Sequence, residues 1–258
     1  NADARQYAVT RGIVDCATDD LQKGVKEADV VILCAPVRVV AEMLTRRIGS
    51  YLRANTLLID IGSTKQDICD AMGTLPIGVQ AIGGHPMTGK EVSGVEHSDA
   101  ALYRGRPFVL CPTRRTTPAT RLRALALIDA LQAIPIEMDA ARHDRVVAAI
   151  SHVPYLVSAS LVAMVAMESG GDPNADVWQL AASGFRDTSR LAGSDIRMMS
   201  DIISTNTQAI AMLLAMFRVQ MGLLETMLIA KDEKQLIEAL TPLREARREW
   251  ATRYEKKP

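Results

Sequence analysis

The sequence lacks several patterns that would identify a function directly. It contains no CxxC or HxxxH spacing, and its four cysteines are far apart, so no metal site is predicted. It has no GxSxG elbow, which argues against a serine hydrolase. Lysine plus arginine and aspartate plus glutamate both number 30, and this zero net charge gives no reason to expect a nucleic-acid partner.

Long uninterrupted apolar runs are also missing. The longest runs break well before the roughly 18 residues of a membrane span, so no membrane partner is expected. Cys34 and Cys111 lie in apolar runs, which is typical of buried free thiols in a reducing compartment. We therefore expect a cytoplasmic protein.

Short apolar runs alternate with helical patterns in the first half of the chain. Residues 30–36 and 56–62 predict strands buried on both faces of a sheet. Further strands are predicted at 79–82, 107–111 and 134–138, and helices at 3–10, 21–27, 37–52, 65–72 and 119–131. This alternation predicts a Rossmann-like, mostly parallel sheet in a first domain, residues 1–139.

From residue 140 onward the patterns are helical, which predicts an all-α second domain, residues 140–258. Helices are expected at 142–167, 175–183, 195–230 and 231–254. The run 202–229 is apolar on more than one face, so it needs cover on several sides. We favour a homodimer in which a second copy supplies that cover. The alternative is a helix at the centre of one subunit's bundle.

The stretch 81–94, AIGGHPMTGKEVSG, fits neither the helical nor the strand period. Ala81 and Ile82 resemble the end of a strand, after which the glycines and Pro86 predict a tight loop of unusual backbone geometry. His85 on such a loop is well placed for chemistry. The alternative is a structural turn that carries a surface histidine.

Other candidates lie after strands or between helices. Ser63 offers a hydroxyl near the His85 loop, although Ser63 and Thr64 could simply cap the next helix. His152 stands before Pro154 in a strained helical region and is predicted to face outward, or else to be a satisfied core residue. Arg190 lies in a glycine-bearing segment that suits carboxylate recognition, or surface ion pairing.

Together these segments resemble the prephenate/arogenate dehydrogenase family of tyrosine biosynthesis. The resemblance covers nearly the whole chain, in the order and spacing of that family. The matching segments are ADVVILCAPV (28–37), DIGSTK (60–65), GGHPMTGKEVSG (83–94), HDRVVAAISHVPY (143–155) and GFRDTSRLAGSD (184–195).

The resemblance implies oxidative decarboxylation of a small molecule, prephenate or arogenate, with hydride transfer to NAD; NADP is not excluded. His85 would take the proton of the substrate hydroxyl, because histidine has a pKa near working pH. Ser63 would bind the same hydroxyl, and Arg190 and His152 would bind the substrate, with Thr88 and Glu91 in its loop. The cofactor would lie at two strand ends, on Ala35, Pro36, Val37, Gly62 and Ser63.

The sequence departs from the family pattern in two places. No GxGxxG occurs, although that fingerprint makes the pyrophosphate site of dinucleotide domains, so we expect the chain to be a fragment without the first β-α-β unit. Ile196 and Met199 stand where the family often has proline and tryptophan, which puts contacts to the substrate ring in doubt.

Two other functions remain open at this point. A β-hydroxyacid dehydrogenase would share the domain plan, but such enzymes generally use a lysine of the helical part, and residues 143–200 contain no lysine. The chain could instead be a helical dimerisation module with a vestigial nucleotide domain.

Overall fold

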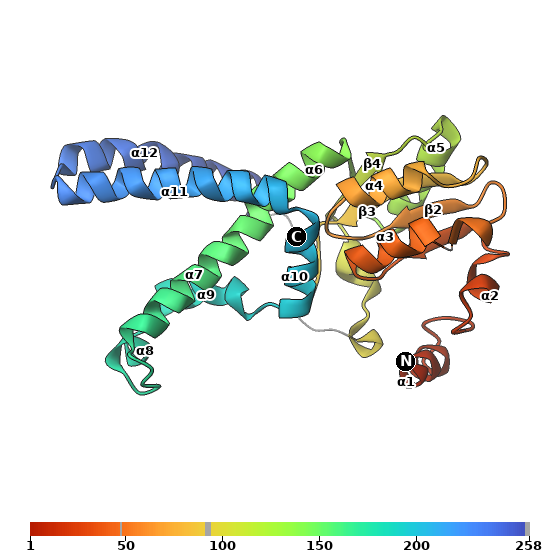
Figure 1. Ribbon diagram of the computed structural model, residues 1–258, viewed down its shortest axis with the longest axis horizontal. Coiled ribbons are helices and arrows are strands. Elements are labelled where there is room, and N and C mark those ends of the chain that lie inside the picture. Colours follow the sequence, from red (N-terminus) through yellow and green to blue (C-terminus); the bar gives the residue numbers. More distant parts are fainter. Residues whose placement is uncertain (47, 91–93, 256–258) are drawn as a thin grey trace. The chain divides into compact units, whose positions relative to one another are not determined.

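A computed structural model describes residues 1–46, 48–90 and 94–255 (Figure 1). Five strands form one sheet in the order β1-β2-β3-β4-β5. Their bounds are β1 Val30–Leu33, β2 Leu57–Asp60, β3 Gln80–Pro86, β4 Pro107–Pro112 and β5 Ile134–Glu137. All neighbours are parallel except β3 and β4, which are antiparallel. The predicted α/β fold with a mostly parallel sheet and a helical second part is confirmed.

Helices cover both faces of this sheet. The first helices are α1 Ala2–Thr10, α2 Leu21–Val25, α3 Val37–Arg46, α4 Gln66–Gly73 and α5 Pro118–Ala130. Leu58 of β2 packs in one cluster with apolar residues of α3 and α4. Its neighbours Leu57 and Ile59 point to the opposite face and pack with α5. Alternate residues of one strand therefore serve two cores, and all four residues of β2 are buried.

Strand β1 differs from its prediction. It ends at Leu33, and only one of its faces is buried, since Val30 and Ile32 are 39% and 43% exposed. Cys34, which follows it, is also exposed rather than buried, whereas Cys111 in β4 is buried as expected. β1 is the edge strand of the described sheet, and its face that carries Val30 and Ile32 is exposed.

The predicted glycine loop after Ile82 is wrong, because β3 continues to Pro86. His85 pairs with Val109 of the antiparallel strand β4, so it lies on a strand. The two glycines before it are required by space and not by a turn. A β-carbon at Gly83 would lie 2.6 Å from Cys69 Sγ, and one at Gly84 would lie 2.5 Å from a main-chain oxygen.

The long helix predicted near 142–167 forms in three pieces: α6 Ala140–Val147, a π-helical turn η4 Ala148–His152, and α7 Val153–Glu168. Asp139 caps its start through the main-chain N–H of Arg142. Pro154 is the second residue of α7, where its missing N–H belongs to the first turn of the helix.

The remaining helices divide the predicted stretches 175–183, 195–230 and 231–254 into shorter elements and add α9 and η5 between them. They are α8 Asp176–Gln179, α9 Ser183–Ser189, the 3-10 turn η5 Arg190–Gly193, α10 Ile196–Thr205, α11 Thr207–Ile229 and α12 Glu233–Trp250. The glycine-bearing segment that contains Arg190 is helical and forms α9 and η5. The single helix expected over 195–230 is interrupted at Asn206, whose side chain is engaged in the core.

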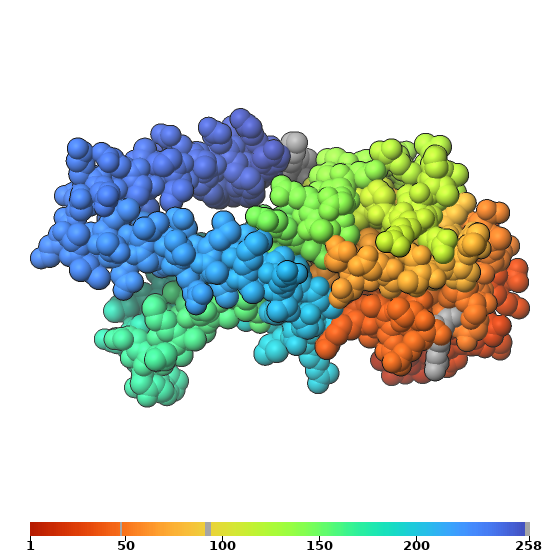
Figure 2. All heavy atoms as spheres, turned by 45° about the horizontal axis from the view of Figure 1, so that its top comes forward, coloured from red at the N-terminus to blue at the C-terminus, as the bar shows by residue number. Residues whose placement is uncertain are grey.

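The chain divides into two compact units, Asn1–Thr207 and Gln208–Pro258. The predicted boundary at 139/140 is a division by sequence pattern and stays a prediction. Within the second unit, α11 and α12 carry many exposed apolar side chains, and Figure 2 shows these helices in blue with their side chains at the surface.

Two helical stretches, Ala140–Glu168 and Thr207–Ile229, are long and apolar enough to cross a membrane by length and composition. This finding contradicts the expectation that the apolar segments of the chain are too short to cross a membrane. Buried core helices of soluble proteins pass the same test. Length and composition therefore do not decide whether these helices contact a membrane, and the absence of a membrane partner stays a prediction.

Candidate functional site

The carboxylate of Asp60, at the end of β2, connects the loop after β2 to the middle of β3. Asp60 and Lys65 are both fully buried and form an ion pair. The same carboxylate accepts the main-chain N–H of Gly62 at 2.7 Å and that of Gly84 at 3.1 Å. A buried carboxylate needs several donors of this kind, so both chain segments are held firmly around it.

This arrangement fixes where two predicted site residues lie. Ser63 directly follows Gly62, and His85 directly follows Gly84. Because both glycine N–H groups bind one carboxylate, the hydroxyl-bearing loop and the histidine-bearing strand meet at the same edge of the sheet. Sequence reasoning predicted this neighbourhood from the carboxyl ends of the strands.

His85 is the first member of a chain of hydrogen bonds that runs into the helical part. Its Nδ1 lies 2.8 Å from Nε2 of His143, on α6. The Nδ1 of His143 lies 2.7 Å from Oδ1 of Asp144. His143 and Asp144 are both buried, so this pair is shielded from water, whereas His85 is half-buried.

Asp144 also caps the N-terminus of α4. Its Oδ1 accepts the N–H of Lys65 at 2.7 Å, and its Oδ2 accepts the N–H of Gln66 at 2.9 Å. The alternative in which Ser63 or Thr64 caps this helix is therefore wrong, since α4 has no cap from its own side chains. A carboxylate at a helix N-terminus satisfies orphan N–H groups and favours negative charge there.

Burial lowers the pKa of His85 well below the usual value, and the neighbouring His143, Lys65 and His152 lower it further. This lowered pKa of His85 differs from the expectation that the histidine titrates near working pH. Burial likewise lowers the pKa of His152, to about 4, although Asp144 opposes the shift. A lowered pKa keeps His85 neutral at pH 7, and the neutral ring is the form that can accept a proton.

His152 is buried at the end of the π-helical turn, so the prediction that it faces outward is wrong. Its Nδ1 lies 3.3 Å from the amide of Asn206, which also donates to the main-chain oxygen of Asp144 at 2.8 Å. Beside them the hydroxyls of Thr64 and Thr205 are 2.9 Å apart. Asn206 thus ties the break between α10 and α11 to the histidine cluster.

A pocket of about 920 Å³ lies at the carboxyl ends of β1 and β2 and extends to α10. An ion pair stands on its wall, from Arg38 Nε to Asp201 Oδ1 at 2.6 Å, and Arg197 also lines it. All five residues predicted to contact the cofactor line this pocket: Ala35, Pro36, Val37, Gly62 and Ser63.

The other predicted substrate residues are not brought together in this pocket. Arg190 is exposed on η5, which packs on α7 through the hydrogen bond from Ala192 N–H to Ser158 Oγ at 3.0 Å. Thr88 is half-buried just after β3. Glu91 lies outside the described residues.

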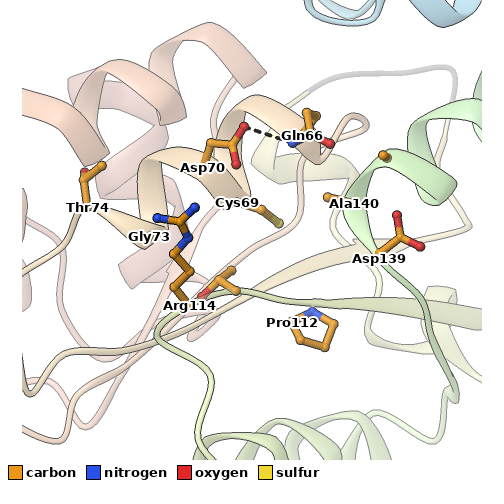
Figure 3. A pocket seen from close by; sticks show the side chains of 11 residues that line it. Gln66, Cys69, Asp70, Gly73, Thr74, Pro112, Arg114, Asp139 and Ala140 are labelled. Atoms are coloured by element: carbon orange, nitrogen blue, oxygen red, sulfur yellow. Dashed lines mark hydrogen bonds between the residues drawn. The ribbon is translucent and has the colours of Figure 1, made fainter.

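A second pocket, of about 700 Å³, contains none of the predicted site residues. Figure 3 shows its walls, formed by α4, the end of β4 and the start of α6, with Gln66 donating to Asp70 at 2.9 Å. Arg114 packs its side chain against Gly73 there. In the described ranges, no group of three or more histidine, cysteine, aspartate or glutamate residues could hold a metal ion.

Sequence reasoning missed three residues that organise the site. Asp60 and Asp144 were not singled out, because the sequence does not show which N–H groups a carboxylate will reach. His143 was quoted only as part of a longer motif. A signal was present in the adjacent pair His143-Asp144 at the start of a long apolar helix, where a buried charge needs a partner.

Two family models together match most of the chain. Residues 1–133 match the family described as prephenate dehydrogenase, nucleotide-binding domain, and residues 139–242 match prephenate dehydrogenase, dimerization domain. The chain belongs to the prephenate dehydrogenase family. The resemblance drawn from the sequence motifs is thereby confirmed.

Individual relatives fall in the same group. A cyclohexadienyl dehydrogenase of Zymomonas mobilis is 30% identical over 98% of this chain and 86% of its own length. A prephenate dehydrogenase of Bacillus subtilis is 36% identical over 79% of this chain, which spans only 54% of that relative's length. The structure also superposes on prephenate dehydrogenase from Aquifex aeolicus in complex with hydroxyphenyl propionate and NAD+. That match has a TM-score of 0.86 and 28% identity, over 96% of this chain and 86% of the other.

Proposed function

We propose that the protein catalyses the oxidative decarboxylation of prephenate or arogenate, with hydride transfer to NAD or NADP, in tyrosine biosynthesis. The observation that carries this proposal is the half-buried His85, whose lowered pKa keeps it neutral, on a strand that meets the Ser63 loop at Asp60, in a chain of the prephenate dehydrogenase family. The products would be 4-hydroxyphenylpyruvate or tyrosine, together with carbon dioxide.

In this proposal His85 accepts the proton of the ring hydroxyl as the hydride leaves the same carbon. Loss of the ring carboxylate then makes the ring aromatic, which drives the reaction forward. Ser63 hydrogen-bonds the hydroxyl and orients it toward His85. Because His85 is neutral, it has a free lone pair for this proton at neutral pH.

The pocket at the ends of β1 and β2 fits part of a nicotinamide cofactor, which when bound supplies the hydride acceptor. Its wall is formed by small or apolar residues such as Ala35 and Gly62, and Arg197 supplies a cation that suits a phosphate. A β-carbon at Gly62 would lie 2.9 Å from Ile68, so the chain there is packed closely beneath the pocket. The likeness in fold to the A. aeolicus relative, which is in complex with NAD+, supports a nicotinamide cofactor for this chain.

The substrate side of the proposal depends on residues outside that pocket. Arg190 would pair with a substrate carboxylate, His152 would face the substrate side chain, and Thr88 and Glu91 would order the substrate loop. The family match supports these roles, since each residue belongs to a segment of the matched domains. The known cyclohexadienyl, prephenate and arogenate dehydrogenases among its relatives leave both substrates within this proposal.

A homodimer built through α11 and α12 is part of the same proposal. The match to a dimerization domain supports it, and exposed apolar residues along α11 supply a surface for a second copy. A dimer interface would also account for helices that are apolar enough for a membrane. We propose a cytoplasmic location, which suits free thiols such as Cys69 and Cys111.

The central test is His85→Asn in the natural enzyme, assayed with prephenate and with arogenate. Turnover should fall by about 10²–10⁴-fold because the proton acceptor is lost, while binding of the substrate changes little. The matched control is His97→Asn, an exposed histidine after β3, which should keep normal turnover. Normal turnover in His85→Asn would remove the imidazole from the mechanism.

A further inference from the structure

Asp144 accepts hydrogen bonds from three donors. These contacts determine which nitrogen atoms of His143 and His85 carry a hydrogen. The N–H groups of Lys65 and Gln66 donate to its two oxygens at 2.7 and 2.9 Å. The Nδ1 of His143 lies 2.7 Å from Oδ1. An ionised carboxylate has only acceptor atoms, so the Nδ1 of His143 must carry a hydrogen and donate it.

A neutral imidazole has one donor nitrogen and one acceptor nitrogen. With its hydrogen on Nδ1, His143 can only accept at Nε2, which lies 2.8 Å from Nδ1 of His85. We propose that His143 and Asp144 are positioning residues that hold His85 with its hydrogen on Nδ1, which leaves Nε2 as the proton-accepting atom. The inference rests on the proposed function in taking His85 as the base.

The opposite arrangement requires a charged His143. In that case Nε2–H of His143 would donate to Nδ1 of His85, and His85 would carry its own hydrogen on Nε2 and could not accept a proton. A charged His143 would pair with Asp144, but it would also place a buried cation 2.8 Å from Nδ1 of His85. Asp144 already accepts two main-chain N–H groups, so its charge is stabilised without a cation, and the cost of desolvating a charged ring favours the neutral arrangement.

The same contacts stabilise the charge that forms during the reaction. When Nε2 of His85 takes the substrate proton, the ring becomes a cation and keeps its Nδ1–H on His143. His143 keeps its Nδ1–H on the Asp144 carboxylate, so the new positive charge faces a polarised imidazole backed by a negative charge. No further proton has to move. This resembles the way in which an aspartate orients a catalytic histidine and stabilises its charged form.

The protein is well suited to a direct test, because it contains only four histidines. Imidazole ¹⁵N labelling of the full chain and long-range ¹H–¹⁵N correlation spectra report which nitrogen of each ring carries the hydrogen. His85 and His143 should both show Nδ1–H. His152 should show Nε2–H, since Asn206 donates to its Nδ1. His97, which is exposed, provides the reference ring in water.

Two substitutions at position 143 separate the hydrogen-bond direction from the mere filling of space. His143→Gln can accept from His85 through its carbonyl and donate to Asp144 through its amide, whereas His143→Phe can do neither. Turnover should fall by about 10²-fold in His143→Phe and stay within about tenfold of normal in His143→Gln, with KM little changed in both. The His85 ring should keep Nδ1–H in His143→Gln and lose this preference in His143→Phe.

The outcomes are distinguishable from failure of the proposed reaction. A wild-type His85 ring with its hydrogen on Nε2 overturns the inference, and so does equal turnover in the two variants at position 143. The ring spectra require no substrate. The expected tautomers without turnover on prephenate or arogenate would support the hydrogen-bond arrangement and reject the proposed function instead.

Discussion

At the scale of single residues, the site depends on buried charges whose partners come from distant parts of the chain. Asp60 binds Lys65 and two main-chain N–H groups, and Asp144 binds two N–H groups and an imidazole. These donors offset the free-energy cost of burying each carboxylate. Removing one partner should therefore cost more than the same change at the surface.

Lys65→Met should destabilise the protein by about 3–5 kcal/mol, because it leaves Asp60 buried without its cation. The measurement is the urea dependence of unfolding. The matched control is Arg46→Met, which removes an exposed ion pair with Glu42 at 2.8 Å and should cost less than about 0.5 kcal/mol. Equal effects of the two substitutions would contradict the importance assigned to the buried pair.

His152 should make stability depend on pH. Burial lowers its pKa to about 4 in the folded protein, whereas an unfolded histidine titrates near about 6.5. Below about pH 6.5 His152 of the unfolded chain binds a proton that the folded chain does not bind. The contribution of His152 to the free energy of unfolding therefore falls as pH decreases, and it levels off below about pH 4. The loss is at most about 3 kcal/mol, and His85, whose pKa is also lowered, acts in the same direction.

Urea unfolding at several pH values between 7 and 4 would check this expectation. In His152→Gln the part of the slope that belongs to this ring should disappear. A wild-type stability that rises on going from pH 6.5 to pH 4.5 would contradict the assigned burial of both histidines.

At the scale of elements, β3 decides the geometry of the site. It leaves a parallel neighbour, β2, and pairs antiparallel with β4 over its second half, where Gly83 and Gly84 allow a close approach to other chain segments. His85 is thereby fixed on a strand with main-chain hydrogen bonds around it. A proton acceptor on such an element is held more precisely than one on a loop.

Gly84→Ala should cost about 1–3 kcal/mol and lower turnover, because its β-carbon would lie 2.5 Å from the main-chain oxygen of Asp60 and 3.0 Å from Phe108. Neither neighbour can move freely, since one is backbone and the other is buried. The control is Gly89→Ala, where no atom lies within 4 Å. Thermal unfolding and steady-state kinetics of the two variants provide the comparison.

At the scale of the whole molecule, α11 exposes apolar side chains that suit a partner surface. Met212, Met216, Val219 and Leu223 follow one another at helical spacing and form one stripe. Phe217, Met221 and Leu228 form a second stripe on the other side of the helix. A helix exposed in this way on two sides is typical of a subunit interface rather than of a free surface.

Val219→Glu should therefore shift the protein from dimer toward monomer, because it places a charge in the proposed interface. Sedimentation velocity at several protein concentrations measures the change. Lys234→Glu, at a highly exposed position of α12, is the control and should leave the dimer intact. A wild-type protein that is monomeric at high concentration, or that partitions into vesicles, would reject the dimer.

Much of this fold was readable from local patterns. The elements β2, α2 and α3 lie within the predicted ranges 56–62, 21–27 and 37–52, because these signals depend on neighbours within a few residues. The errors have a common cause. The continuation of β3 through two glycines and the break at Asn206 depend on which distant segment lies alongside, and no local period records that.

The sequence by itself determined the family, the alternation of strands and helices, and His85 and Ser63 as the candidate residues, because residue types and their spacing carry that information. Only the tertiary structure decided that Asp144, 79 residues beyond Lys65, caps α4 and anchors His143 behind His85. The physical reason is that a buried carboxylate is satisfied by whichever donors the packed fold brings to it. The proton-accepting atom of His85 is in turn set by that packing.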